Sequence, residues 1–209
     1  AAETFGDVDH AALGLTQLAC AERAGIVFVM LTPGEPIDID DWLGGFADEL
    51  ATLKLDSWHI FEQRELPGPG WKVALDGYLE SYQHDSLHGK TVGKLTIGNL
   101  LVLDTWGPHQ RLTFGRKSLA DLVGVPEQEW DVNQHIRLIH NCFPSLSISG
   151  ILGDHCLVSQ IFPGSTPSST ITRQTVLSAT EPKTDEARAA TELFSAMVLK
   201  AVADEVYRV

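Results

Sequence analysis

The segment HIRLIHNCFPSLSISGILGDHCLVSQIF, residues 135–162, decides the fold class. It contains three short runs rich in apolar and β-branched residues, at 135–143, 145–151 and 155–162, separated by turn-forming Pro, Gly and Asp. Runs of this length between turn residues are typical of β-strands. Because short connections join neighbouring strands, we expect these runs to lie side by side in an antiparallel sheet.

Similar segments occur on both sides of this region. Strands are predicted at 25–31, 58–66, 96–104, 109–117 and 168–180, and helices at 42–53, at 71–89 and from about Thr184 to the end of the chain. Asp185 and Glu186 lie in the first turn of that last helix, where acidic side chains are favourable. Consecutive strands followed by a helix predict an α+β domain, with helices on one face of an antiparallel sheet.

Composition restricts the class of protein. The 209 residues are 44% apolar and 21% charged, which is enough for one sizeable domain with a core. The formal net charge of −13 disfavours a nucleic-acid partner. The sequence has no apolar run of about 18 residues, so we expect no membrane span. Cys20, Cys142 and Cys156 are too scattered for a disulfide framework and indicate a reducing cytoplasm.

The predicted helix WKVALDGYLESYQHDSLHG, residues 71–89, carries most of the chemistry. His84 and His88 are four residues apart, and Glu80 lies four residues before the first histidine. Positions four apart share a helix face, and imidazole with carboxylate is a ligand set for Fe(II), Zn(II) or Mn(II). The residues alone leave three interpretations open: an iron site, a hydrolytic zinc site at Glu80, His84 and His88, or an ordinary solvated helix face.

The same stretch with its preceding glycine, GWKVALDGYLESYQHDSLH, resembles the iron-binding helix of the ring-hydroxylating oxygenases, the Rieske non-haem iron family. The family pattern is approximately N-W-K-x-x-x-[DE]-N-[FY]-x-[DE]-x-Y-H-x-x-x-x-H, and the residues in register are Trp71, Lys72, Asp76, Glu80, Tyr82 and His88. Residues 5–36 resemble the segment that joins the family's Rieske and catalytic domains. Residues 96–119 are similar to the strand pair that follows the iron helix in one branch of the family.

The resemblance implies a helix-grip (START/Bet v 1-like) fold, in which a curved antiparallel sheet surrounds a long C-terminal helix and a substrate cavity. Residues 1–24 would follow a Rieske domain that lies upstream or is absent, and residues 25–209 would form a catalytic domain truncated at its C-terminus. The implied activity is hydroxylation, as a monooxygenase or dioxygenase of aromatic catabolism, of an aromatic or similar hydrophobic substrate with O2 at a mononuclear Fe(II).

The resemblance also implies partners. The chain lacks the C-x-H and C-x-x-H pairs that hold a Rieske [2Fe-2S] cluster, so we expect the cluster only on the upstream domain. The full-length protein would be a homotrimer that receives electrons from a reductase or ferredoxin. Glu80 would be the electron bridge to the cluster of a neighbouring subunit, and Asp76 would support the iron ligands.

Two positions depart from the family pattern. The first histidine position falls on Gln83, so either the adjacent His84 replaces it or a ligand is lost; adjacent helix positions differ by about 100°. The family's third ligand, an Asp in a pattern like E-D-[FY]-x-[VI], falls on Val206, and Asp204 is nearby but out of register. The candidate ligands are therefore His88, His84, Gln83 and Asp204. The alternative function is an iron-deficient helix-grip domain that only binds a hydrophobic ligand.

Overall fold

The computed structural model describes residues 2–80, 88–89, 91–150 and 153–207. These residues belong to two compact units, Ala1–Asp56 and Ser57–Val209. Among the helices within these described ranges, none is long and apolar enough to cross a membrane.

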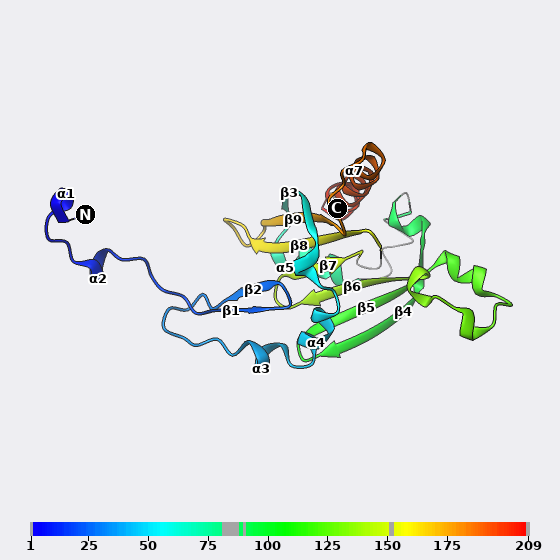
Figure 1. Cartoon of the computed structure of the whole chain (residues 1–209), viewed down its shortest axis with the longest axis horizontal. Coiled ribbons are helices and arrows are strands. Elements are labelled where there is room, and N and C mark those ends of the chain that lie inside the picture. The colour runs from blue at the N-terminus through cyan, green and yellow to red at the C-terminus, as the bar shows by residue number, and fades with distance from the viewer. Residues whose placement is uncertain (1, 81–87, 90, 151–152, 208–209) are drawn as a thin grey trace. The chain divides into compact units, whose positions relative to one another are not determined.

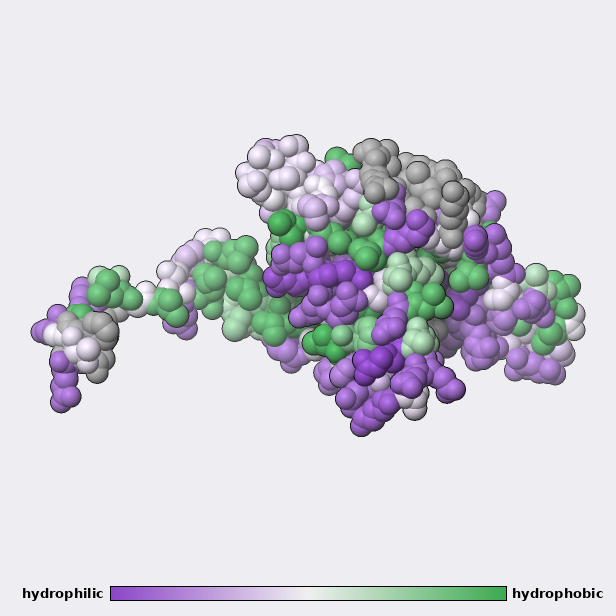
Figure 2. Space-filling model, turned by 90° about the horizontal axis from the view of Figure 1, so that it is seen from above, coloured by the Kyte–Doolittle hydropathy of each residue, from purple (hydrophilic) through white to green (hydrophobic). Residues whose placement is uncertain are grey.

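The N-terminal unit contains a β-hairpin that the sequence predicted only in part. β2 (Ile26–Val29) lies in the predicted strand, but its partner β1 (Cys20–Arg23) lies outside the predicted strands. Ala24 and Gly25 join them with φ angles of 54° and 79°. Positive φ at both central residues is typical of the tight turn that suits the twist of a hairpin. Hydrophobic side chains are visible on the surface of this unit (Figure 2), and the exposed ones include Val27, Val29 and Leu31.

The short helices of this unit also differ from the prediction. The unit begins with α1 (Ala2–Phe5) and α2 (His10–Leu13), and the single helix expected at 42–53 is divided into α3 (Ile39–Leu43) and α4 (Phe46–Ala51). The Asp38 side chain accepts a hydrogen bond from the Asp41 amide at 3.0 Å and so caps α3. Gly44 ends α3 with φ 50° and ψ −139°, a conformation that strongly favours glycine.

The C-terminal unit is built on a seven-stranded antiparallel sheet with the order β3-β9-β8-β7-β6-β5-β4 (Figure 1). Its strands are β3 (His59–Gly68), β4 (Thr96–Trp106), β5 (His109–Arg116), β6 (Ile136–Cys142), β7 (Leu146–Ser149), β8 (His155–Pro163) and β9 (Thr170–Ser178). Short 3₁₀ helices are η1 (Leu55–Ser57), η2 (Val92–Lys94), η3 (Lys117–Leu122), η4 (Glu127–Glu129) and η5 (Val132–Gln134). The predicted α+β class, with a large antiparallel sheet and a long C-terminal helix, is confirmed.

The edge position of β3 explains why it extends beyond the predicted strand. Pro67 and Gly68 belong to β3 and lie beyond residue 66, where the predicted strand ends. A proline is tolerated in an edge strand because the missing amide faces no partner. Gly68 is also needed for packing, since a Cβ atom there would lie 2.7 Å from the ring of Tyr207.

The helix predicted over 71–89 is confirmed only as far as Leu79 among the described residues. α5 covers only Trp71–Leu79, and Glu80 has extended dihedral angles of φ −91° and ψ 145°. His88 and Gly89 lie in a bend and a turn, so His88 is not on a helix. Glu80 and His88 therefore do not share a helix face.

The C-terminal helix packs over the sheet. α7 (Asp185–Lys200) begins at Thr184, whose Oγ1 accepts a hydrogen bond from the Ala187 amide at 3.2 Å, and continues into the π-helix η6 (Ala201–Val206). Val198 is buried against Leu157 of β8 and Val176 of β9, and Phe61, Phe194 and Met197 complete this apolar contact. Burying this helix face is the main driving force for its position.

Candidate active site

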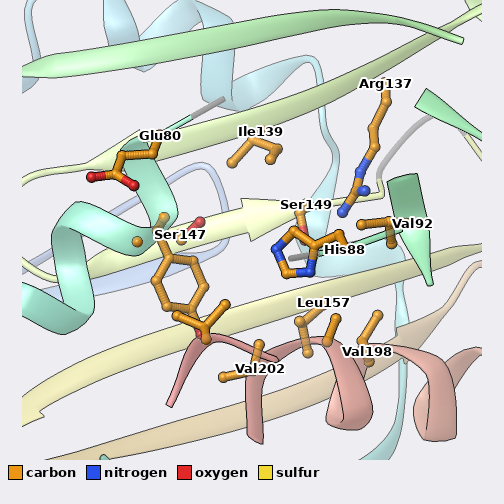
Figure 3. A pocket seen from close by; sticks show the side chains of 14 residues that line it. Glu80, His88, Val92, Arg137, Ile139, Ser147, Ser149, Leu157, Val198 and Val202 are labelled. Atoms are coloured by element: carbon orange, nitrogen blue, oxygen red, sulfur yellow. The ribbon is translucent and has the colours of Figure 1, made fainter. Parts of the chain in front are cut away.

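A pocket lies between α5, the middle strands of the sheet and the C-terminal helix (Figure 3). Its apolar wall comes from β6, β8, α7 and η6 and consists of Ile139, Leu157, Val198, Ala201, Val202 and Val206. A largely apolar lining with a few polar groups is typical of small-molecule sites.

The polar side chains of the pocket come from separate elements. Glu80 follows α5, His88 precedes η2, Arg137 is on β6, and Ser147 and Ser149 are on β7. His88 is only 5% exposed, and Figure 3 shows its imidazole within the pocket. Glu80 and His88, which the sequence proposed as site residues, thus meet in one pocket without a shared helix.

The remaining predicted site residues are not found in the described lining of the pocket. Gln83 and His84 lie outside the described residues. Asp76 is exposed on α5, and Asp204 is exposed on η6, where its Oδ2 is 3.4 Å from Nζ of Lys200. Neither carboxylate is part of the described pocket lining, whereas Val206 is.

The donor set can be compared with the needs of an iron ion. Within the described ranges, no group of three or more His, Cys, Asp and Glu side chains could hold a metal ion. His88 supplies one imidazole in the pocket, and Val206, which has no donor atom, lines it from the C-terminal helix. The described residues therefore do not complete a mononuclear iron site by themselves.

Buried polar groups form a row across the sheet beside the pocket. Asn141 pairs with Ser147, Ser147 with Ser159, and Ser159 with Gln174 in the strand register. All four are at most 4% exposed. The Asn141 amide, the Ser147 and Ser159 hydroxyls and Nε2 of Gln174 make no hydrogen bond with the described residues. Such a row offers several donors and acceptors to water or a ligand.

Two tyrosines lie above this row. Burial raises the pKa of both Tyr78 and Tyr207, and the proximity of the two phenols raises that of Tyr78 further. Oη of Tyr207 is 2.5 Å from Oγ1 of Thr172. Oη of Tyr78 is close to Ser159 and Gln174 but makes no hydrogen bond within the described part of the chain. Both phenols therefore remain neutral at physiological pH.

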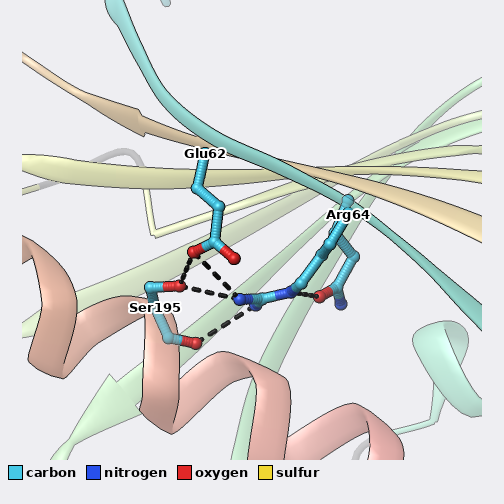
Figure 4. A network of polar contacts seen from close by, with 4 residues as sticks. Glu62, Arg64 and Ser195 are labelled. Carbon is cyan, nitrogen blue, oxygen red and sulfur yellow. Dashed lines mark hydrogen bonds and ion pairs between the residues drawn. The ribbon is translucent and has the colours of Figure 1, made fainter.

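An arginine fixes the C-terminal helix over the sheet (Figure 4). Arg64 of β3 donates from Nη1 to Oγ of Ser195 at 2.7 Å and from Nη2 to the Ser195 carbonyl at 3.1 Å. Its Nε donates to Oε1 of Gln174 at 2.8 Å. The Ser195 hydroxyl in turn donates to Glu62 at 2.5 Å. A register shift between Ile60 and Glu62 lets Phe61 and Glu62 both face α7.

Sequence reasoning missed Arg137 and the serines of β7. The signal was present, because residues 137, 139 and 141 alternate with 138 and 140 and so share one face of β6. The alternation along β6 does not show that the face with Arg137 lies beneath α7 and His88.

A helix-grip domain with a pocket beneath its C-terminal helix is the class that this fold and site define. Residues 55–205 match the model of the ring hydroxylating alpha subunit (catalytic domain), so the chain belongs to the ring-hydroxylating oxygenase family. The predicted membership in this Rieske-type family is thereby confirmed.

Solved structures share the fold of this chain. A quaternary ammonium Rieske monooxygenase, CntA in complex with the inhibitor MMV12, has a TM-score of 0.72 at 17% identity, with 91% of this chain and 50% of that chain covered. The terminal oxygenase of carbazole 1,9a-dioxygenase from Novosphingobium sp. KA1 has a TM-score of 0.50 at 13% identity, with 91% and 56% covered. The chain thus spans about half the length of these structures. No curated protein matches the sequence.

Proposed function

We propose that this domain hydroxylates a small molecule with a hydrophobic, for example aromatic, body, using O2 and a mononuclear iron. The observation that supports the proposal best is the position of His88, a buried imidazole in an apolar-walled pocket of a ring-hydroxylating oxygenase catalytic domain. Imidazole is a common ligand of non-haem iron. His84 or Gln83 is proposed as the second ligand, on the basis of the sequence pattern.

The chain's own residues would bind and orient the substrate. The apolar side chains from β6, β8 and the C-terminal helix would exclude water around its hydrophobic body. Iron would supply the redox chemistry with O2. The role proposed for the apolar pocket residues is to hold and desolvate the substrate.

Glu80 is proposed as the electron bridge to a neighbouring subunit. It follows the last residue of α5, lines the pocket and is partly exposed, so its carboxylate can be reached from both the pocket and the surface. The electrons would come from a [2Fe-2S] cluster in a homotrimer, supplied by a reductase or ferredoxin. Asp76 is exposed on the same helix, three residues before Leu79, and its proposed supporting role would be indirect.

A second candidate function is ligand binding without iron. The position of Val206 favours it, because the C-terminal helix presents an apolar side chain to the pocket while Asp204 is exposed beside Lys200. A site without this carboxylate would hold Fe(II) less tightly.

Iron uptake distinguishes the two functions. The full-length protein and its His88→Ala variant are incubated anaerobically with Fe(II), desalted and analysed for iron. The oxygenase proposal expects about one Fe(II) per chain beyond any cluster iron in the wild type, and a clear loss in the variant. No iron uptake by the wild type beyond any cluster iron, with a hydrophobic probe still bound, would contradict it and support the ligand-binding function.

A further inference from the structure

Arg137 is a cation inside the pocket without an acidic partner among the described residues. It makes no hydrogen bond or ion pair with any residue that the structure describes, and its side chain is directed toward the part of the pocket where His88 and Ser149 lie (Figure 3). The residue as a whole is partly exposed, but burial lowers the pKa of its guanidinium to about 10, and the positive charge of Arg116 adds to this effect. Burying an unpaired charge is costly, so an arginine at this position needs a compensating anion.

The strand register places a second arginine beside it. Arg137 pairs with Phe114 across β5 and β6, and Arg116 lies two residues from Phe114, so both arginines project from the same face of the sheet. Arg116 and Arg137 both line the adjoining cavity next to Ser149. Neither arginine forms an ion pair with Glu80 or Asp154, the carboxylates of the two described linings. This corner of the pocket is therefore positive.

The positive charge of this corner contrasts with the negative net charge of the protein. With a formal net charge of −13, the protein as a whole repels anions. Two neighbouring arginines beneath the C-terminal helix reverse that tendency in one place. Ser149 of β7 lies beside Arg137 in the pocket (Figure 3), because its register partner Ile139 is two residues from Arg137 on β6.

We propose that the substrate carries a carboxylate, that the guanidinium of Arg137 binds this group, and that the hydroxyl of Ser149 donates a further hydrogen bond to it. The planar guanidinium matches the two oxygens of a carboxylate, and the apolar wall opposite accommodates the hydrophobic body. This inference rests on the proposed function, because it names the substrate class of the same pocket: an anionic rather than a purely hydrocarbon compound.

Binding of a matched pair of probes tests the inference. Benzoate and benzamide have nearly the same size and shape, but only benzoate is charged at neutral pH. Each is titrated into the iron-free full-length protein by calorimetry. We expect benzoate to bind about tenfold more tightly, which corresponds to ~1.4 kcal/mol. Equal affinities for the two probes, or no binding of either, would overturn the proposal.

Variants at residue 137 test whether the preference for benzoate over benzamide depends on the Arg137 side chain. Arg137→Gln should abolish the benzoate preference, and Arg137→Lys should keep part of it, because a lysine retains the charge without the planar fork. Arg173→Gln is the matched control, since it removes the same charge from an exposed arginine paired with Glu65. Retention of the preference in Arg137→Gln would refute the assignment; thermal unfolding verifies that each variant is folded.

The iron-free format separates this inference from the proposed function. If the wild type takes up no iron, the oxygenase proposal is contradicted, but the preference for benzoate can still be measured. Normal iron uptake without a benzoate preference would reject only the anionic substrate.

Discussion

Val206 packs so closely on Gly77 that a Cβ atom at residue 77 would lie 2.9 Å from Cγ1 of Val206. This contact joins α5 to the C-terminal helix at the pocket, and both residues line it. The side chain at 206 is thus directed toward α5 and the pocket, in contrast to Asp204, which is exposed.

Gly77→Ala tests the tightness of this contact. An alanine in a helix is normally more favourable than a glycine by about 1 kcal/mol. Here we expect a net loss of about 1 kcal/mol in the free energy of unfolding, because overpacking against a stiff valine outweighs that gain. Denaturant unfolding of Gly77→Ala, alone and combined with Val206→Ala, measures the effect. Adding Val206→Ala should recover the stability that Gly77→Ala loses. If Gly77→Ala alone stabilised the protein, the contact with Val206 would have to relax freely.

Val206→Asp tests whether the pocket lacks only its carboxylate. An aspartate at this position would place a carboxylate in the lining that contains His88, and we expect Fe(II) to bind more tightly than in the wild type. Anaerobic titration with Fe(II) provides the measurement. Asp204→Ala is the control and should leave iron affinity unchanged, since that side chain is exposed beside Lys200. The reverse result would identify Asp204 as the ligand.

Arg64→Met tests the network that holds α7. The substitution removes hydrogen bonds to Ser195 and Gln174 and leaves their acceptors without a donor in a partly buried site. We expect the free energy of unfolding to fall by about 2 kcal/mol. Arg173→Met, which breaks an exposed ion pair with Glu65, should cost at most about 1 kcal/mol. Chemical denaturation compares the two, and similar losses would mean that the network contributes no more than a surface pair.

Thiol reactivity tests the burial of the cysteines. Burial raises the pKa of both Cys142 and Cys156 to about 12, whereas Cys20 is exposed. Because the thiolate is the reactive form, the native protein should react quickly with a disulfide reagent at Cys20 alone, and all three cysteines should react after unfolding. The slow thiols should stay protonated from pH 7 to about pH 10, since their pKa lies higher. The Cys20→Ser variant should lose the fast phase; persistence of that phase would show that a buried cysteine is accessible.

The sequence predicted more of the sheet than of the site. All seven strands of the C-terminal unit overlap predicted segments, because strand patterning depends on nearby residues. Within the described residues, the helix expected over 71–89 covers only Trp71–Leu79, so Glu80 and His88 do not share a helix face. Glu80 and His88 nonetheless line one pocket. They come together through the tertiary fold and not through a shared helix.

The sequence by itself determined the α+β class, the start of the last helix near Thr184 and the family, since each depends on patterns of residues along the chain. Only the tertiary structure decided that Val206 lines the pocket, that Asp204 is exposed, and that Arg137 lies with His88 beneath the C-terminal helix. The physical reason is that alternation along a strand specifies which side chains share a face. Which helix covers that face depends on apolar packing between residues far apart in the chain, such as Leu157 and Val198.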